Sequence, residues 1–312
     1  MKVLVTGGAG FIGSHICERL LSMGHSVVCV DNFSAGRKSN IEHFLSLPNF
    51  QLYTCDICYI TADVFKDVDL VCHQAALGSV PRSMKFPTDF NRVNVNGFMH
   101  VLQLALEANV KRVVYASSSS VYGDNLTMPK KENEIGRPLS PYAATKQINE
   151  LYADVYNRCY GMETIGLRYF NVFGPRQNQF GDYAAVIPSF ISRLAAGLRC
   201  TINGDGSIMR DFTYVSNVVD ANIAALFSTN PDIVGVYNIG CGELTSIKRL
   251  YEMLRDITHS DNNVIFGPAR AGDIVLSVAD ISKATKTFNY TPTIGVEDGL
   301  KTTVQLYMET SR

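Results

Sequence analysis

The chain has 312 residues, of which 28 are basic and 29 acidic, so its bulk charge points to neither nucleic acid nor an anionic membrane as a partner. This length suits two modest lobes around large cores. No apolar run approaches the ~20 residues of a membrane span, and Met1-Lys2 leads into a predicted strand without a signal-peptide pattern. We therefore expect a cytoplasmic protein.

The eight cysteines are scattered through predicted strands and helices, where cysteine packs as a small hydrophobe. Cys55 and Cys58 form a CxxC pair, but neither a second pair nor a histidine cluster accompanies them. We therefore expect neither a disulfide framework nor a metal site.

A glycine-rich turn follows the first predicted strand, which ends near Val5, and an apolar helix over residues 16–23 comes next. Gly7 permits a sharp turn, Gly10 lets backbone N–H groups approach a pyrophosphate, and Gly13 lets helix and strand pack closely. The positive end of the helix then faces the phosphates. This order of strand, glycine turn and helix predicts a dinucleotide site.

An acidic residue, Asp31, ends the second predicted strand, residues 26–30. A carboxylate there accepts hydrogen bonds from an adenine-ribose diol and repels a 2′-phosphate, which favours NAD over NADP. The polar loop over residues 32–36 is expected to wrap over the adenosine half, whereas Arg37 and Lys38 are interpreted as solvated.

Three more predicted strands end in residues suited to a ligand, because open parallel sheets bind ligands at their carboxyl edge. After residues 50–54 comes Asp56, which is placed to reach an adenine amino group. After residues 69–73 comes the small-residue segment 74–78, which suits either close passage of a cofactor or a tight packing turn. After residues 112–115 comes a run of serines, 117–120, which forms a hydroxyl-lined rim.

Two long helices are predicted over residues 89–108 and 141–160. Asn94 lies inside the first helix, where asparagine lowers helix propensity, so we expect its side chain to make a specific interaction. In the second, the i,i+4 spacing places Tyr142 and Lys146 on one face.

The predicted fold is α/β, a doubly wound parallel sheet of the Rossmann type with a smaller C-terminal α/β lobe. A sixth strand is expected over residues 162–168, and beyond Pro175 glycine-rich connections join shorter helices. We predict a cofactor domain over 1–168, to which 212–239 returns, and a substrate domain over 169–312.

The glycine motif, the serines before Tyr122-Gly123 and the Tyr142/Lys146 pair resemble the extended short-chain dehydrogenase/reductase family over essentially the whole chain. Within it the chain is most similar to nucleotide-sugar epimerases, and above all to bacterial UDP-N-acetylglucosamine 4-epimerases. The segments that carry this resemblance are 168–174, 210–215, 78–83, 183–188 and 277–282, together with Gln177.

The resemblance implies reversible C4 epimerisation of a UDP-hexose by tightly bound NAD. Tyr142 takes the proton of the sugar 4-hydroxyl while C4 passes hydride to NAD, and the 4-keto sugar rotates and is reduced on its other face. Because a phenol pKa near ~10 is too high for a base at neutral pH, Lys146 and the positive nicotinamide ring are expected to lower it. Ser118 hydrogen-bonds the same oxygen, and Lys146 also holds the nicotinamide ribose.

The remaining site residues are implied by the resemblance. Asn171, Arg210 and Arg270 are assigned to the UDP phosphates, and a small residue at Ser277 admits an N-acetyl group. The implied cofactor contacts are Gly7, Gly10, Phe11, Ile12, Gly13, Asp31, Asn32, Phe33, Ser34, Gly36, Asp56, Ile57, Gln74, Ala75, Ala76, Asn94, Tyr142, Lys146 and Phe170. The other implied substrate contacts are Gly78, Ser79, Ser118, Ser119, Tyr142, Gln177, Ala185, Val186, Thr201, Asn203 and Asp273.

Alternatives on the same scaffold stay open. A UDP-glucuronate decarboxylase or 4-epimerase fits if the site holds a partner for a C6 carboxylate, and the sequence does not decide between N-acetylated and plain hexoses. A 4,6-dehydratase is disfavoured, since it would carry an Asp-Glu pair after a threonine where this chain has serines 118–120. A non-catalytic NAD sensor tends to lose the tyrosine or the lysine. The two long helices resemble the pair that forms a four-helix homodimer interface in the family.

Overall fold

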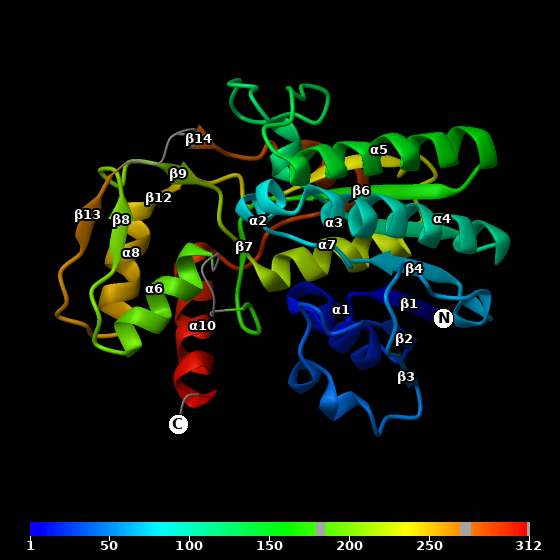
Figure 1. Ribbon diagram of the computed structural model, residues 1–312, viewed down its shortest axis with the longest axis horizontal. Helices are drawn as coiled ribbons and strands as arrows, with labels where there is room; N and C mark the ends of the chain where they lie inside the picture. Colours follow the sequence, from blue (N-terminus) through cyan, green and yellow to red (C-terminus); the bar gives the residue numbers. More distant parts are fainter. Residues whose placement is uncertain (179–184, 269–275, 311–312) are drawn as a thin grey trace.

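The computed structural model describes residues 1–178, 185–268 and 276–310. Within these residues the centre is a seven-stranded sheet in the order β11-β6-β5-β4-β1-β2-β3, and every neighbouring pair is parallel (Figure 1). The predicted parallel α/β architecture is therefore confirmed. The strands are β1 (Lys2–Thr6), β2 (Ser26–Val30), β3 (Phe50–Tyr53), β4 (Leu70–His73), β5 (Arg112–Ser118), β6 (Glu163–Tyr169) and β11 (Gly235–Ile239).

Helices cover both faces of this sheet, because successive strand residues point to opposite sides. Val3 joins the hydrophobic cluster beneath one pair of helices, and its neighbour Leu4 joins the cluster beneath the other pair. The covering helices are α1 (Phe11–Ser22) and α7 (Val215–Phe227) on one face, and α4 (Phe98–Glu107) and α5 (Pro141–Tyr160) on the other.

The predicted helix over 89–108 is interrupted in the structure. It consists of α3 (Pro87–Phe90), a π-helical turn η4 (Asn91–Gly97) and α4. Asn94 lies in the π turn, where its amide bonds both main-chain groups of Leu77 at 2.8 and 3.1 Å and the Thr145 hydroxyl at 3.1 Å. These side-chain bonds accompany the wider turn, which is common near functional sites.

The chain returns to the main sheet after its excursion into the second lobe. β11 pairs in parallel with β6, and α7 packs against α1. The domain division at residue 168 stays a prediction.

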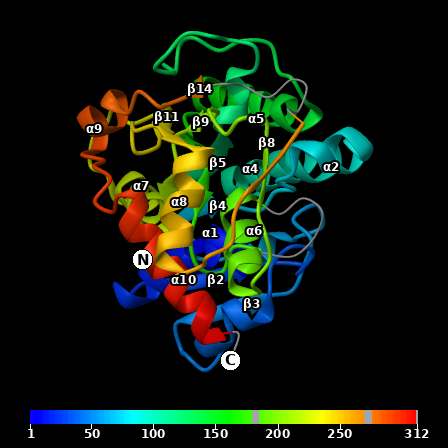
Figure 2. The same cartoon turned by 90° about the vertical axis from the view of Figure 1, so that its left-hand side faces the viewer.

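The second lobe is built from small sheets and short helices, which Figure 1 shows on the left and Figure 2 shows in front of the main sheet. Its strands are β7 (Val172–Phe173) with β10 (Thr213–Tyr214), β8 (Thr201–Asn203) with β13 (Ile265–Gly267), and β12 (Thr245–Ser246), β9 (Met209–Arg210) and β14 (Leu276–Ser277) in a third sheet. Its helices are α6 (Val186–Ala195), α8 (Ile247–Ile257) and α10 (Val296–Thr310), whereas α9 (Ser282–Phe288) packs against β11 of the main sheet. The remaining short elements are α2 (Val80–Lys85), η1 (Lys38–Asn40), η2 (Glu42–Phe44), η3 (Ala62–Phe65) and η5 (Ser119–Tyr122). None of the helices in the described ranges is both long and apolar enough to cross a membrane.

Candidate active site

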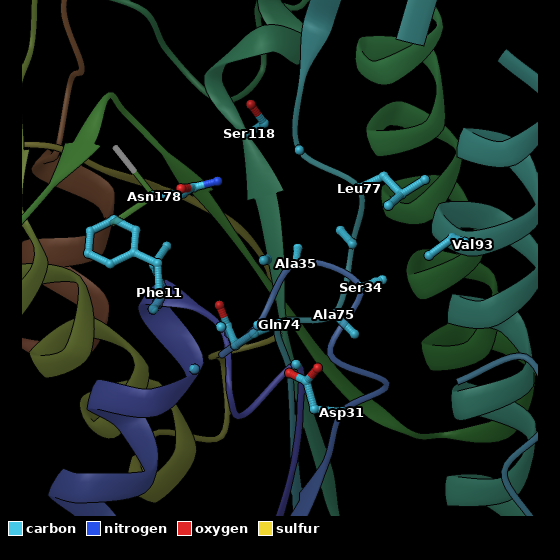
Figure 3. A pocket seen from close by; sticks show the side chains of 18 of the residues that line it. Phe11, Asp31, Ser34, Ala35, Gln74, Ala75, Leu77, Val93, Ser118 and Asn178 are labelled. Atoms are coloured by element: carbon cyan, nitrogen blue, oxygen red, sulfur yellow. The ribbon is translucent and has the colours of Figure 1, made fainter. Parts of the chain in front are cut away.

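A cavity of about 760 Å³ lies at the carboxyl edge of the main sheet. Its walls come from the ends of β1 to β5, from α5, and from the segment that leaves β6. Figure 3 shows Asp31 and Ser118 at opposite ends of the view, with Gln74 between them and Phe11 and Asn178 at one side. This size and this place in the fold are typical of a cofactor and substrate site.

The glycine loop forms a cradle that a side chain would fill. Gly7 has a φ of +68°, and a Cβ there would stand 2.7 Å from the Ala75 nitrogen. A Cβ on Gly13 would stand 2.1 Å from the Gly7 carbonyl oxygen. Helix α1 starts immediately after Gly10, which gives it no side-chain cap, so the first-turn N–H groups remain for an anionic ligand. The loop therefore fits a dinucleotide pyrophosphate.

Asp31 is held at the other end of this cradle. The Ala9 N–H donates to Oδ2 at 3.0 Å and the Phe33 N–H donates to Oδ1 at 2.7 Å. Burial raises the pKa of this carboxyl, and the two N–H bonds oppose that rise. Each oxygen keeps lone-pair capacity for a ribose hydroxyl, so the geometry suits a diol better than a phosphate.

Tyr142, Lys146 and Ser118 line the same cavity. The first two lie one turn apart on α5, which begins at Pro141 because the Ser140 hydroxyl caps the Ala143 N–H at 3.1 Å. Ser118 ends β5, where its hydroxyl donates to the Ser120 hydroxyl and accepts the Ser120 N–H, both at 3.1 Å, and it stands near the Tyr142 phenol. Lys146 is 2% exposed and donates from Nζ to the Ala116 carbonyl at 2.8 Å.

The protein's own groups do not lower the pKa of Tyr142, and the joint effect expected of Lys146 and the bound nicotinamide ring stays a prediction. Burial raises the pKa of Tyr142, and only the hydrogen bond with Ser118 opposes it. Burial also lowers the pKa of Lys146 to about 8, against the attraction of the Glu150 carboxylate. Both charged forms lose hydration inside the cavity, so a phenolate at neutral pH needs a further positive charge nearby.

The cavity brings most of the predicted cofactor residues together. It also contains six of the predicted substrate residues, namely Gly78, Ser118, Ser119, Tyr142, Asn171 and Gln177. The predicted cofactor residues that line it are Gly7, Gly10, Phe11, Ile12, Gly13, Asp31, Asn32, Ser34, Gly36, Asp56, Ile57, Gln74, Ala75, Ala76, Tyr142 and Lys146.

Four of the predicted residues before the second lobe lie outside the cavity wall. Phe33 packs against the hydrophobic core, and Ser79 caps α2 by accepting the Arg82 N–H at 3.2 Å. Asn94 is 1% exposed and holds Leu77, which itself lines the cavity. Phe170 is fully buried against Tyr122, with ring centroids 6.1 Å apart, so its side chain faces away from the cavity. Their contacts with a ligand stay predictions.

The predicted substrate residues of the second lobe are dispersed. Arg210 and Ser277 are direct partners in the β9/β14 ladder, whereas Thr201 and Asn203 lie on the separate strand β8. Ala185 and Val186 lie at the start of α6. None of these six described residues lines the cavity. Arg270 and Asp273 lie outside the described residues.

Several cavity residues were not predicted. Arg37, interpreted as solvated, lines the wall and donates to Asn178 Oδ1 at 2.6 Å. Arg176 bridges to Glu18 at 2.7 Å, and Arg92 bridges to Asp56 at 3.2 Å. Arg176 and Asn178 could have been predicted from the sequence, because they flank the predicted substrate residue Gln177. Arg37 could not, because its partner lies 141 positions away.

Comparisons with known proteins agree over the whole chain. A profile of the NAD dependent epimerase/dehydratase family matches residues 3–240. The chain is 36% identical to a putative UDP-glucose 4-epimerase of Methanocaldococcus jannaschii, covering 99% of each protein. Among solved structures it resembles a UDP-N-acetylglucosamine 4-epimerase from Methanobrevibacter ruminantium M1 in complex with UDP-N-acetylmuramic acid, with 40% identity, a TM-score of 0.94, and 99% and 98% of the two chains covered. It also resembles a UDP-glucuronic acid 4-epimerase from Bacillus cereus in complex with UDP-glucuronic acid and NAD, with 33% identity, a TM-score of 0.92, and all of both chains covered.

These matches confirm the family resemblance that the motifs indicated, and they agree with a cavity whose glycine cradle and Asp31 fit NAD. The chain belongs to the NAD-dependent epimerase/dehydratase family, and its cofactor is NAD.

Proposed function

We propose that this protein interconverts the C4 epimers of a UDP-hexose, with UDP-N-acetylglucosamine and UDP-N-acetylgalactosamine as the preferred pair. UDP-glucose and UDP-galactose are further candidates. The observation that carries the proposal is that Ser118, Tyr142 and Lys146 share one cavity with the glycine cradle. The whole-length relatives named as UDP-sugar 4-epimerases support it.

The side chains account for the proton chemistry. Tyr142 accepts the proton of the sugar 4-hydroxyl, and Ser118 hydrogen-bonds the same oxygen and orients it. NAD, when bound, supplies the hydride acceptor and, in its oxidised form, a positive ring. Lys146 uses one N–H for the Ala116 carbonyl, which leaves two for ribose hydroxyls. Tyr142 returns its proton when C4 of the 4-keto sugar is reduced from the opposite face.

Epimerisation requires the hexose to turn while the nucleotide stays held. In this proposal Asn171, Arg210 and Arg270 hold the diphosphate, and Thr201, Asn203 and Asp273 complete the nucleotide pocket. Gln177 closes the hexose side with Ser119 and Ala185. The buried Gln177 Oε1 has no hydrogen-bond partner in the described structure, which supports a contact with a ligand donor.

The preference for an N-acetylated sugar rests on Ser277. This small residue is Arg210's partner in the β9/β14 ladder, so the proposed sugar C2 side and the proposed phosphate side belong to one small sheet. A bulkier residue there would narrow the space beside an N-acetyl group.

A UDP-glucuronate 4-epimerase or decarboxylase is the second candidate. The observation in its favour is Arg82, a cation that lines the cavity near Gly78 and suits a C6 carboxylate. A non-catalytic NAD sensor is disfavoured, because Ser118, Tyr142 and Lys146 are all present and adjacent to the cradle.

Separate incubations with UDP-N-acetylglucosamine, UDP-glucose and UDP-glucuronate, without added cofactor, test the proposal. Chromatography should show the C4 epimer of the first sugar without net reduction of NAD. Epimerisation of UDP-glucuronate alone, or release of carbon dioxide from it, would select the second candidate. Failure to convert any of the three, in protein that contains NAD, would reject an epimerase.

We also propose a cytoplasmic homodimer that pairs α4 and α5 across a four-helix interface. Along α5, Leu151 is 67% and Tyr160 57% exposed, and Tyr152 and Val155 between them are exposed as well, a grouping of apolar side chains that is typical of protein interfaces. All eight cysteines are free thiols, which suits a reducing compartment.

Light scattering should give a dimer mass, and Leu151→Glu should give a monomer. Leu126→Glu, at an 86% exposed loop position, is the control and should stay dimeric.

A further inference from the structure

The second lobe contains a carboxylate that is withdrawn from solvent and takes no part in the cavity wall. Asp211 is 0% exposed and follows Arg210 at the end of β9. Its Oδ1 accepts the Cys241 N–H at 2.8 Å, and its Oδ2 accepts the N–H groups of Gly242 at 2.9 Å and Ala279 at 3.2 Å. Burying a charge is costly unless it is hydrogen-bonded, so these three main-chain donors hold the carboxylate in place.

The main chain of the same residue makes two more bonds. The Asp211 N–H donates to the Ser277 carbonyl at 3.0 Å, and the Asp211 carbonyl accepts from Asn171 Nδ2, also at 3.0 Å. One residue thus joins the turn after β6, the end of β9, the turn after β11 and the segment after β14. Three of these four segments carry a residue of the proposed nucleotide-sugar wall, namely Asn171, Arg210 and Ser277.

Close packing leaves the Asp211 carboxylate no access to a ligand. A Cβ added to Gly240 would stand 2.6 Å from its Oδ2 and 2.8 Å from the Ala279 side chain. Asp211 therefore does not touch substrate, and any effect on binding passes through the segments that it joins. Their alignment is otherwise weakly determined, because β9 and β14 are strands of two residues with few ladder bonds.

We propose that Asp211 is a positioning residue that aligns the second-lobe wall for binding of the UDP moiety. This inference rests on the proposed function for the identity of the ligand. It concerns binding of the nucleotide diphosphate and leaves the proton chemistry of Tyr142 untouched.

The test is Asp211→Asn, which keeps the shape but replaces one acceptor by an amide that cannot accept an N–H. We expect the Kd for UDP, measured by calorimetry, to rise by about tenfold, and KM for the active UDP-sugar to rise likewise while kcat changes by less than about threefold. Bound NAD should stay at the wild-type level. Asn230→Asp is the matched control, since Asn230 bonds the Thr287 carbonyl and the Asp232 N–H at 2.9 Å each, away from the cavity.

A second variant approaches the carboxylate from the other side. Gly240→Ala keeps Asp211 but displaces its Oδ2, so it should weaken UDP binding in the same direction even if Asp211→Asn does not fold. UDP affinity equal to wild type in a folded Asp211→Asn or Gly240→Ala protein would overturn the inference. An equal loss of UDP affinity in the control would also overturn it. If wild-type protein binds UDP but converts no UDP-sugar, the proposed function fails while the calorimetric comparison still decides this inference.

Discussion

The cofactor wall of the cavity is made differently from the wall that we propose for the nucleotide sugar in the second lobe, whose residues do not line this cavity in the described structure. The cofactor wall is a row of residues that directly follow parallel strands, such as Gly7 after β1, Asp31 after β2 and Gln74 after β4. The second-lobe wall draws on segments between residues 171 and 277 that belong to short strands in separate sheets. In the first wall the ladder itself sets each position, whereas in the second a buried side chain such as Asp211 connects the parts.

The difference shows why one wall tolerates so little change. The backbone packs so closely around the glycine cradle that no Cβ fits at Gly7 or Gly13, so the cradle keeps its geometry only when these positions carry no side chain. The second wall is expected to shift when the Asp211 hydrogen bonds are altered, because its two-residue strands have few ladder bonds of their own.

The largest expected effect tests whether the chemistry belongs to the cofactor wall. Tyr142→Phe removes the proton acceptor, so turnover should fall by about a thousandfold or more while bound NAD stays at the wild-type level. Tyr59→Phe, at a position that is 69% exposed, is the control and should keep full activity. Retention of a tenth of the wild-type turnover would mean that another group accepts the proton.

A glycine exchange tests the claim that the cradle has no spare volume. In Gly13→Ala the new Cβ would stand 2.1 Å from the Gly7 carbonyl oxygen, so the loop must shift. We expect a loss of about 1–3 kcal/mol in the free energy of unfolding and at least about a tenfold fall in NAD content. Gly295→Ala, where a Cβ meets nothing within 4 Å, should match wild type in both. A Gly13→Ala protein with normal NAD content would contradict this account of the loop.

The Glu150 carboxylate beside Lys146 offers a test of the electrostatics of the cofactor wall. Glu150 accepts Arg168 Nε and the Ser117 hydroxyl at 2.8 and 2.5 Å. The other titratable groups near Lys146 include His73, on which its charge acts, and Tyr142, one turn earlier on α5. In Glu150→Gln the attraction that raises the Lys146 pKa is lost, and Arg168 loses its carboxylate partner. Because the ammonium is charged only below its pKa, the alkaline limb of the kcat profile should move to lower pH.

We expect kcat of Glu150→Gln to fall by several-fold more at about pH 8.5 than at about pH 6.5, relative to wild type. Glu107→Gln, on α4 and away from the cavity, is the control. A uniform fall across the pH range would indicate a structural defect instead.

The smallest expected effect is on the pH dependence of stability, through the contact between α1 and the segment that leaves β6. His15 on α1 hydrogen-bonds the Pro175 carbonyl at 3.1 Å, and burial, followed by the Arg176 charge, lowers its pKa to about 4 from 6.5. The unfolded chain therefore binds more protons between these values, so stability falls as pH drops through this window, by about 1.4 kcal/mol per unit.

Chemical denaturation at about pH 6.5 and about pH 5 checks this sign. His15→Gln should lose about 1.5 kcal/mol less than wild type across that interval, and the exposed His43→Gln should behave as wild type. An acid response of His15→Gln identical to that of wild type would show that His15 does not contribute.

Local sequence patterns were sufficient to predict the succession of strands and helices around the main sheet, the glycine cradle, the position of Asp31 and the placement of Tyr142 and Lys146 on one helix face. These features depend on interactions within a few residues, namely glycine conformation, strand endings and i,i+4 spacing. A motif of contiguous residues therefore carries them completely.

Which side chains face the cavity, and how burial changes their pKa values, could be learned only once the chain was folded. In the structure, the Phe170 ring packs against Tyr122, the Asn94 amide binds the main chain of Leu77, and Arg37 donates a hydrogen bond to Asn178. The structure also shows that burial raises the pKa of Tyr142, and that only the hydrogen bond with Ser118 opposes this rise. Such outcomes depend on desolvation and on partners far apart in the chain, which no local pattern of residue types records.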